Sequence, residues 1–285
     1  MPATTAVTPI RTARPRRHGA GAPRVSVVIP TLNEARNIGW VLSRLPADLH
    51  EVIIVDGRST DDTVAAARRA RPEVRVLAQT ARGKGAALAT GLAAATGDIA
   101  VMLDADGSMD PAEIPGLVGA LLAGADVVKG SRAAAGGGST DLSRLRRLGN
   151  WGLTFLANRL YRQHWRELCY GYAAFWTDAL PALAVAQIGH TPGAPAGTVY
   201  GHGFEIEAVL FCRAARAGLR VAEVFSFEHD RRTGQSNLST FKDGWRVLTA
   251  VLKERRYTTT SKPARHTRNY PLTPILHDTT LPTAA

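Results

Sequence analysis

The stretch Ile99-Ala100-Val101-Met102-Leu103-Asp104-Ala105-Asp106-Gly107-Ser108 joins an unbroken apolar run to two carboxylates and a glycine. A short apolar run that ends in turn residues is typical of a buried strand. Because the two acids directly follow the run, they emerge close together where the strand ends. This stretch predicts a strand of an α/β sheet with a ligand site at its carboxyl end.

The same alternation of apolar runs and helical stretches continues around this segment. It predicts strands at Val25–Ile29, Glu51–Val55, Val74–Ala78, Ile99–Leu103 and Asp126–Lys129. It predicts helices at about Glu34–Leu45, Thr60–Ala70, Lys84–Ala95 and Pro111–Ala123. Repeated strand and helix alternation favours a doubly wound, mostly parallel sheet with helices on both faces.

Polar residues and glycines follow four of these strands and also occupy the third connection. The segments are Pro30-Thr31-Leu32-Asn33-Glu34, Asp56-Gly57-Arg58-Ser59-Thr60-Asp61, Arg82-Gly83-Lys84-Gly85, Asp104-Ala105-Asp106-Gly107-Ser108 and Gly130-Ser131-Arg132. Each alone fits a helix N-cap or a turn. Together they predict one rim that binds a ligand, because parallel strands end at the same edge of a sheet.

Asp104 and Asp106 are the candidate metal ligands, because paired carboxylates suit Mg²⁺ or Mn²⁺ and leave positions open for phosphate oxygens. Such an ion would stabilise a departing diphosphate. The alternative is a capped turn before a helix that starts at Asp110-Pro111. Arg132 is placed to clamp phosphate oxygens in pairs, and Asp56 to accept hydrogen bonds from a ribose or a base.

Composition limits the function classes. The 285 residues are 45% hydrophobic and 21% charged, and their formal net charge is +11. A basic chain suits phosphates or an anionic membrane, whereas zinc-ligand spacing and aromatic-basic patterns typical of nucleic-acid binding are absent from the sequence. Isolated Cys169 and Cys212 indicate buried thiols and a cytoplasmic protein. No apolar run reaches the roughly 18 residues that a membrane-spanning helix needs.

Together these segments resemble glycosyltransferase family 2, whose members are inverting enzymes with a GT-A fold. The further stretches Gly203-Phe204-Glu205-Ile206-Glu207 and Arg232-Thr233-Gly234-Gln235-Ser236-Asn237-Leu238 are similar to the dolichol- and polyprenyl-phosphate sugar synthases of that family. The resemblance covers about Arg24 to Arg256. It implies a GT-A, Rossmann-like sheet with an acceptor-side extension toward the C-terminus.

The resemblance also implies roles for individual residues. The residues expected to bind a nucleoside-diphosphate sugar are Pro30, Thr31, Asn33, Glu34, Asp56, Lys84, Asp104, Ala105, Asp106 and Arg132. Those expected to act in catalysis are Asp106, Arg132, Glu167 and Glu205, and those expected to hold an acceptor phosphate are Arg232, Ser236 and Lys242. The implied organisation is a basic tail (1–23), a donor half (24–132), an acceptor half (133–256) and a second tail (257–285).

Three departures from the family pattern bear on function. Asp56-Gly57 replaces two adjacent acids, so one nucleoside contact is absent or comes from elsewhere. Glu167 stands where many relatives carry an Asp. The membrane helices that commonly follow the catalytic domain in relatives acting on lipid phosphates are not found.

The acceptor stays open between two interpretations. If a hydroxyl attacks, Glu167 or Glu205 would take its proton, whereas a lipid phosphate is already ionised and needs no strong base. Leu142–Trp165 is either a basic amphipathic helix lying on an anionic membrane or a helix packed on the core, and the second is favoured.

The leading hypothesis is sugar transfer to a polyprenyl phosphate, with peripheral contact at the inner face of the membrane. A soluble acceptor such as a secondary metabolite is the alternative. A nucleotidyltransferase is disfavoured because no glycine-rich loop follows the first strand. A non-enzymatic binding protein is the remaining class, and the sequence does not indicate an oligomeric state.

Overall fold

The computed structural model describes residues 21–79, 81–188, 201–235 and 239–256. From Pro23 onward these residues belong to one compact unit. The predicted tails, apart from residues 21–23, lie outside the described residues.

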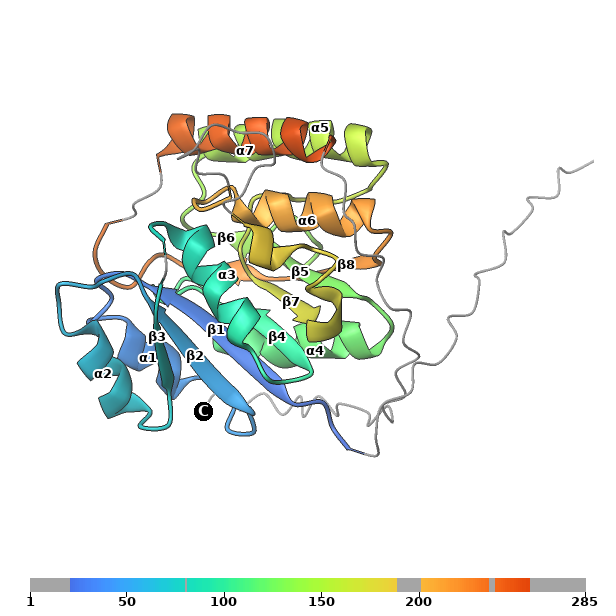
Figure 1. The fold of residues 1–285 in the computed structure, drawn as a ribbon. Helices are drawn as coiled ribbons and strands as arrows, with labels where there is room; N and C mark the ends of the chain where they lie inside the picture. The colour runs from blue at the N-terminus through green and yellow to red at the C-terminus, as the bar shows by residue number, and fades with distance from the viewer. Residues whose placement is uncertain (1–20, 80, 189–200, 236–238, 257–285) are drawn as a thin grey trace, which may run out of the picture. The chain divides into compact units, whose positions relative to one another are not determined.

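Seven strands form one mixed sheet in the order β3-β2-β1-β4-β7-β5-β8 (Figure 1). Their bounds are β1 Val25–Thr31, β2 Glu51–Asp56, β3 Arg75–Ala78, β4 Ile99–Met102, β5 Val127–Ser131, β7 Ala173–Trp176 and β8 Val221–Phe225. Only β7 in this sheet runs antiparallel to its neighbours, β4 and β5. The mostly parallel α/β fold is confirmed.

Seven α-helices occur within the described residues. Their bounds are α1 Ile38–Ser43, α2 Thr63–Ala70, α3 Lys84–Ala94, α4 Ile114–Leu122, α5 Arg144–Tyr161, α6 Ile206–Arg216 and α7 Thr240–Glu254. Short 3-10 turns cover Pro111–Glu113, Thr177–Ala179 and Val185–Gln187, and the two-residue strands β6 Gly138–Ser139 and β9 Phe227–Glu228 pair separately. Figure 1 shows α3 in front of the sheet and α1 behind it.

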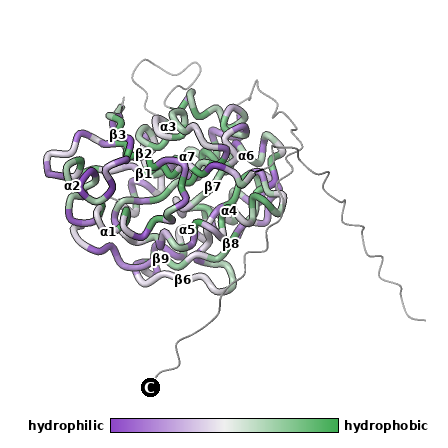
Figure 2. The backbone as a smooth tube through the Cα atoms, turned by 90° about the horizontal axis from the view of Figure 1, so that it is seen from below, coloured by the Kyte–Doolittle hydropathy of each residue, from purple (hydrophilic) through white to green (hydrophobic). Residues whose placement is uncertain are grey.

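The apolar runs of the sequence become the buried centre of the sheet. All four residues of β4 are buried, and so are most residues of β1 and β2. Figure 2 shows hydrophobic chain around β1, β2 and β7, with hydrophilic chain toward the periphery near α2. At Gly91, helix α3 lies so close to the sheet that a Cβ there would be 2.3 Å from Val28 Cγ1. This close packing places the start of α3 beside the carboxyl ends of the strands.

Several predicted boundaries were wrong. Helix α1 begins at Ile38 instead of Glu34, because Glu34 first forms a turn in which its carbonyl accepts from the backbone N–H of Asn37 at 2.9 Å. The helix predicted over Leu142–Trp165 is shorter: the Ser143 hydroxyl caps its first turn, and Arg162 ends it in the left-handed region at φ 55°.

Helices α5 and α7 pack against each other and against α6, on one side of the sheet (Figure 1). A buried ion pair joins Arg213 of α6 to Glu254 of α7, with Nη2 and Oε1 2.9 Å apart. The Tyr161 hydroxyl at the end of α5 donates to the Val251 carbonyl of α7 at 2.6 Å. Across the described part of the chain, every helix is too short or too polar to cross a membrane.

Candidate active site

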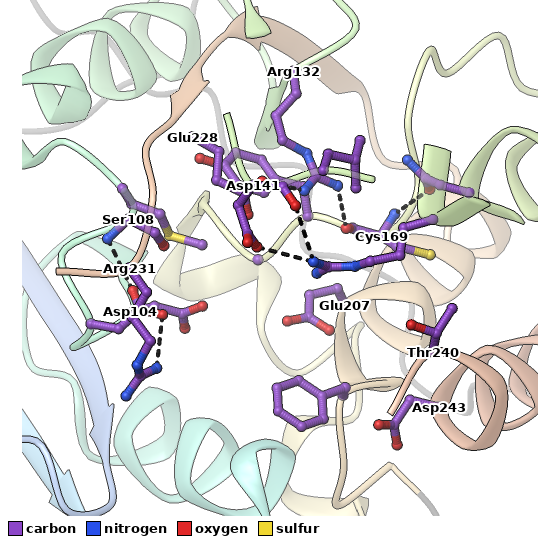
Figure 3. Close-up of a pocket in the computed structure, with 18 of the residues that line it drawn as sticks. Asp104, Ser108, Arg132, Asp141, Cys169, Glu207, Glu228, Arg231, Thr240 and Asp243 are labelled. Carbon is purple, nitrogen blue, oxygen red and sulfur yellow. Dashed lines mark hydrogen bonds and ion pairs between the residues drawn. The ribbon is translucent and has the colours of Figure 1, made fainter. Parts of the chain in front are cut away.

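Two pockets meet at the predicted carboxylates. The strand pocket, of about 260 Å³, lies at the carboxyl ends of β1 to β4. The helix pocket, of about 430 Å³, extends from the same point to α5 and α7 (Figure 3). The residues common to both are Lys84, Asp104, Asp106, Phe204 and Arg231. The boundary between the two pockets is therefore the charged centre of the site.

The strand pocket brings together many of the predicted donor-binding residues. The predicted residues that line it are Pro30, Thr31, Glu34, Lys84, Asp104, Ala105 and Asp106. They come from the loops after β1 and β4 and from the start of α3, as expected for the edge of a parallel sheet. Gly57 after β2 and Gln79 after β3 complete the far end of the pocket.

Lys84 bridges two carboxylates at the boundary. Its Nζ lies 2.8 Å from Asp104 Oδ2 and 2.9 Å from Glu207 Oε1. Burial, with the charge of Asp106 adding to it, raises the pKa of Asp104 to about 6, although Lys84 acts in the opposite direction. Burial alone would lower the pKa of Lys84, but the charges of Asp104 and Glu207 raise it above its ordinary value. Lys84 therefore remains a cation at this point.

Arg231 holds the second predicted metal ligand. Its Nη1 lies 3.1 Å from Asp106 Oδ2, and its Nη2 pairs with Glu34. The segment that carries Arg231 crosses the Asp106–Ser108 loop, where the backbone N–H of His229 donates to the Ser108 carbonyl at 2.8 Å. Arg232 packs its guanidinium over Trp40, 4.5 Å from the ring centroid. This segment thus covers the carboxylates on one side.

The carboxylates at the boundary fit a divalent cation with few protein ligands. Within the residues that the structure describes, no group of three or more His, Cys, Asp or Glu side chains is arranged to hold a metal ion. Asp104 and Asp106 supply two oxygen donors that face the pockets, which suits Mg²⁺ or Mn²⁺ because these ions keep other positions for water or phosphate. Lys84 and Arg231 pair with oxygens of these two carboxylates, so an ion bound there would compete with both cations.

Arg132 lines the helix pocket and is held by two acids. Its Nε donates to Glu167 Oε1 at 2.8 Å and its Nη1 to Glu228 Oε2 at 2.8 Å. The Glu167 carboxylate also accepts from the Arg132 backbone N–H at 2.7 Å and from Asn150 Nδ2 at 2.7 Å. Glu167 is 1% exposed and does not line either pocket. This geometry gives Glu167 the means to orient Arg132, and leaves it poorly placed to take a proton from an acceptor.

Glu205 is likewise directed away from both pockets. Its Oε1 accepts from the backbone N–H groups of Gly201 at 3.1 Å and Gly203 at 3.3 Å, in the turn before α6. Glu207, two residues later in the first turn of α6, lines the helix pocket instead. The acid of this motif that reaches the site is therefore Glu207.

Other predicted residues also lie outside the pockets. The Asp56 carboxylate caps a local turn, accepting from the Ser59 backbone N–H at 3.0 Å and the Ser59 hydroxyl at 2.6 Å. The Asn33 side chain is also occupied locally, because its Oδ1 accepts from the backbone N–H of Thr60 at 2.8 Å. Arg232 and Lys242 are exposed and line neither pocket, and Ser236 lies outside the described residues.

Sequence reasoning missed several residues that the fold brings to the site. These are Gln79, Asn150, Tyr170, Glu207, Glu228, Arg231 and Asp243. Glu207 lay inside a quoted motif beside the chosen Glu205, and Arg231 directly precedes the quoted stretch that begins at Arg232. The others gave no local signal, because they come from segments that the chain brings together only on folding.

The comparisons with known proteins identify the family of the chain. Residues 26–183 match the family profile described as glycosyl transferase family 2. An uncharacterized glycosyltransferase of Mycobacterium tuberculosis is 42% identical over 40% of this chain and 50% of its own length, so the match spans about half of that relative. The undecaprenyl-phosphate mannosyltransferase of Micrococcus luteus is 32% identical over 76% of this chain and 88% of the relative.

Among solved structures, glucosyl-3-phosphoglycerate synthase from Mycobacterium tuberculosis, in complex with Mn²⁺, UDP and glucosyl-3-phosphoglycerate, aligns with a TM-score of 0.61. It is 25% identical, over 84% of this chain and 82% of that one. The matched profile covers more than half of the chain and includes Asp104 and Asp106, the residues at which the two pockets meet. The chain therefore belongs to glycosyl transferase family 2.

Proposed function

We propose that this glycosyltransferase moves a sugar from a nucleoside-diphosphate sugar to a polyprenyl phosphate while bound peripherally to a membrane. The observation that carries the proposal is an exposed apolar and basic surface on α5 and α7, directly beside the helix pocket. The Micrococcus luteus relative, named as an undecaprenyl-phosphate mannosyltransferase, supports the same acceptor.

The donor side of the proposal rests on the strand pocket. Its carboxylates would hold Mg²⁺ or Mn²⁺, which would supply Lewis-acid stabilisation of the leaving diphosphate. Lys84 and Arg231 add two cations at the same point, and Arg132 adds a third on the acceptor side. Charge that develops on the leaving group is therefore met by groups already in place.

The acceptor side rests on what α5 and α7 leave exposed. Along α5, Leu148, Trp151 and Phe155 are 65%, 65% and 62% exposed, and along α7, Phe241 and Trp245 are 80% and 67% exposed. Exposed apolar side chains at this density are typical of an interaction surface. The predicted core packing of the α5 leucines fails for Leu145 and Leu148, because the helix turns Thr154, Ala157 and Tyr161 inward instead.

An anionic bilayer is the occupant that this surface fits. Exposed basic residues accompany the apolar side chains on both helices: Arg144, Arg147, Arg159, Arg162, Lys242, Arg246 and Lys253. Apolar side chains next to basic ones are typical of helices that lie in a membrane interface. The inner faces of the same helices line the helix pocket through Asn150 and Leu153 of α5 and Val247 of α7. A lipid phosphate would thus reach Arg132 from the bilayer without leaving the protein surface.

A phosphate acceptor also fits the placement of the acids. Glu167 is occupied by other contacts and Glu205 faces neither pocket, and an ionised phosphate oxygen needs no base to attack the anomeric carbon. As the new glycosidic bond to the phosphate oxygen forms, the bond to the diphosphate breaks, and the nucleoside diphosphate leaves with the electron pair.

The test combines turnover with membrane binding. Purified protein is incubated with Mn²⁺, UDP- or GDP-sugars and a short polyprenyl phosphate, and we expect a sugar-lipid product. Flotation with anionic vesicles should recover the wild type, whereas Trp151→Gln/Phe155→Gln should stay behind. Phe225→Gln, an equally exposed site on β8, is the matched control and should float. A wild type that forms no sugar-lipid with any donor would refute the lipid acceptor.

A second candidate acceptor is a small soluble phosphate ester. The structural neighbour from Mycobacterium tuberculosis is named for a soluble product, and the polar lining of the helix pocket by Asp141, Arg146 and Asp243 is compatible with a polar acceptor. In this case phosphoglycerate or a similar ester would be consumed in solution. The Trp151→Gln/Phe155→Gln variant would then turn over as fast as the wild type.

A further inference from the structure

Gln79 lies at the end of the strand pocket that is farthest from the paired carboxylates. It directly follows β3, is 9% exposed, and lines the pocket together with Gly57, Pro30 and Leu32. Its backbone N–H donates to the Asp56 carbonyl at 3.1 Å, which fixes the residue against the end of β2. Within the described residues, its side-chain amide makes no hydrogen bond. An amide that faces a pocket with its donor and its acceptor unused can pair with a ligand that enters the pocket.

The space beside Gly57 is already occupied by this glutamine. A Cβ at Gly57 would lie 3.0 Å from the Thr31 carbonyl oxygen and 3.4 Å from Gln79 Oε1. Asp56, the remaining acid after β2, is turned toward Ser59 and lines neither pocket. The sequence thus lacks the second of two acids after β2, and the structure fills that place with the Gln79 amide.

The strand order gives the approximate distance from the paired carboxylates to the Gln79 amide. Asp104 follows β4, and the strands lie in the order β4, β1, β2, β3. With about 4.8 Å between neighbouring strands, Gln79 lies roughly 14 Å along the rim from Asp104. A ribose and two phosphates separate a nucleobase from a bound cation by a similar length. The amide therefore stands where the base of a nucleoside diphosphate would lie if its phosphates met Asp104, Lys84 and Arg231.

From these contacts we infer that Gln79 is the residue that reads the nucleobase, by pairing its amide with a ring N–H and the neighbouring carbonyl of uracil or guanine. The inference rests on the proposed function for the presence of a nucleoside diphosphate in the strand pocket. An amide offers one donor and one acceptor side by side, and the two oxo bases present the complementary pair. A carboxylate at this place would accept from the ring N–H and offer nothing to the carbonyl.

Calorimetric titration separates base recognition from phosphate binding. Wild type, Gln79→Ala, Gln79→Glu and the control Gln187→Ala, which alters an exposed glutamine outside both pockets, are titrated with UDP, GDP and inorganic pyrophosphate in Mn²⁺. Both Gln79 variants should bind the preferred nucleotide about tenfold more weakly, as expected for the loss of a hydrogen-bonded pair. Their affinity for pyrophosphate should stay within about twofold of the wild type, and Gln187→Ala should match the wild type throughout.

The outcomes distinguish the inference from the proposed function. Circular dichroism first verifies that each variant is folded. A Gln79→Ala protein that binds the nucleotide as tightly as the wild type would overturn the inference, and so would one that loses nucleotide and pyrophosphate affinity in equal measure. A wild type that binds neither UDP nor GDP would overturn the proposed donor site itself.

Discussion

Glu167→Gln tests whether this acid orients Arg132 or acts as a base. The substitution keeps the size of the side chain and removes its charge from a site where Glu167 is 1% exposed and the Arg132 side chain 6%. Breaking one partner of a buried ion pair costs about 3–5 kcal/mol. Glu228 stays paired with Arg132 at 2.8 Å, so we expect the lower end, about 3 kcal/mol of the free energy of unfolding.

The assay is thermal and urea unfolding, which needs no knowledge of the substrate. A loss of about 3 kcal/mol corresponds to a Tm lower by roughly 6–12 °C in a domain of this size. Glu73→Gln is the matched control, because Glu73 pairs with Arg71 while 64% exposed, and its unfolding should be unchanged. A Glu167→Gln protein that unfolds like the wild type but loses turnover would refute the positioning role and restore Glu167 as a candidate base.

Three further changes have outcomes that the structure specifies. The pKa of Asp104 is raised to about 6, so between pH 4 and 6 the folded state holds a proton that the unfolded state has lost. The free energy of unfolding of the wild type, relative to Asp104→Asn, should therefore fall by about 1.4 kcal/mol per pH unit over this range and level off above it. Urea unfolding measures this difference. Arg231→Ala frees Asp106 and Glu34 and should tighten Mn²⁺ binding in the absence of nucleotide about tenfold, measured by calorimetry. Gly91→Ala drives a methyl group against β1 and should lower the free energy of unfolding by about 1–3 kcal/mol.

Each of these has an outcome that contradicts it. A stability difference between wild type and Asp104→Asn that is flat from pH 4 to 6 would show that this carboxyl is not shifted upward. Unchanged or weaker Mn²⁺ binding by Arg231→Ala would mean that Arg231 does not compete with a cation. For Gly91→Ala, the control is Gly116→Ala on α4, where an added Cβ meets nothing within 4 Å; equal stabilities would disprove the close packing of α3.

Local sequence patterns predicted those helices and strands whose local preference matches their burial in the fold. The Ile99–Leu103 run became β4 because residues buried on both faces of a sheet must all be apolar, and that requirement is visible in the sequence. The start of α1 was misplaced, because the turn at Glu34 depends on a hydrogen bond from its backbone N–H to the Thr63 hydroxyl, in a helix far along the chain. The antiparallel β7 was not predicted, because an apolar run of four residues carries no direction.

The residues of the candidate site also divide into those that local sequence predicted and those that it did not. Asp104, Lys84 and Glu34 were found because Asp104 and Glu34 lie within three residues of a strand end and Lys84 begins a helix, so the edge of the sheet places them. Glu167 and Glu205 were chosen as acids in the right motifs, but the direction of a carboxylate depends on which donors surround it after folding.

The amino-acid sequence by itself determined the family, the parallel sheet and the position of the paired carboxylates at the end of β4. These follow from hydrophobic periodicity and from motifs of adjacent residues, which are local properties of the chain. Only the tertiary structure decided which charges meet, namely Lys84 with Glu207 and Arg231 with Asp106, and that the Gln79 amide fills the space beside Gly57. Such contacts join segments that are distant in the sequence, and their geometry is fixed by the order of the strands and the packing of the helices.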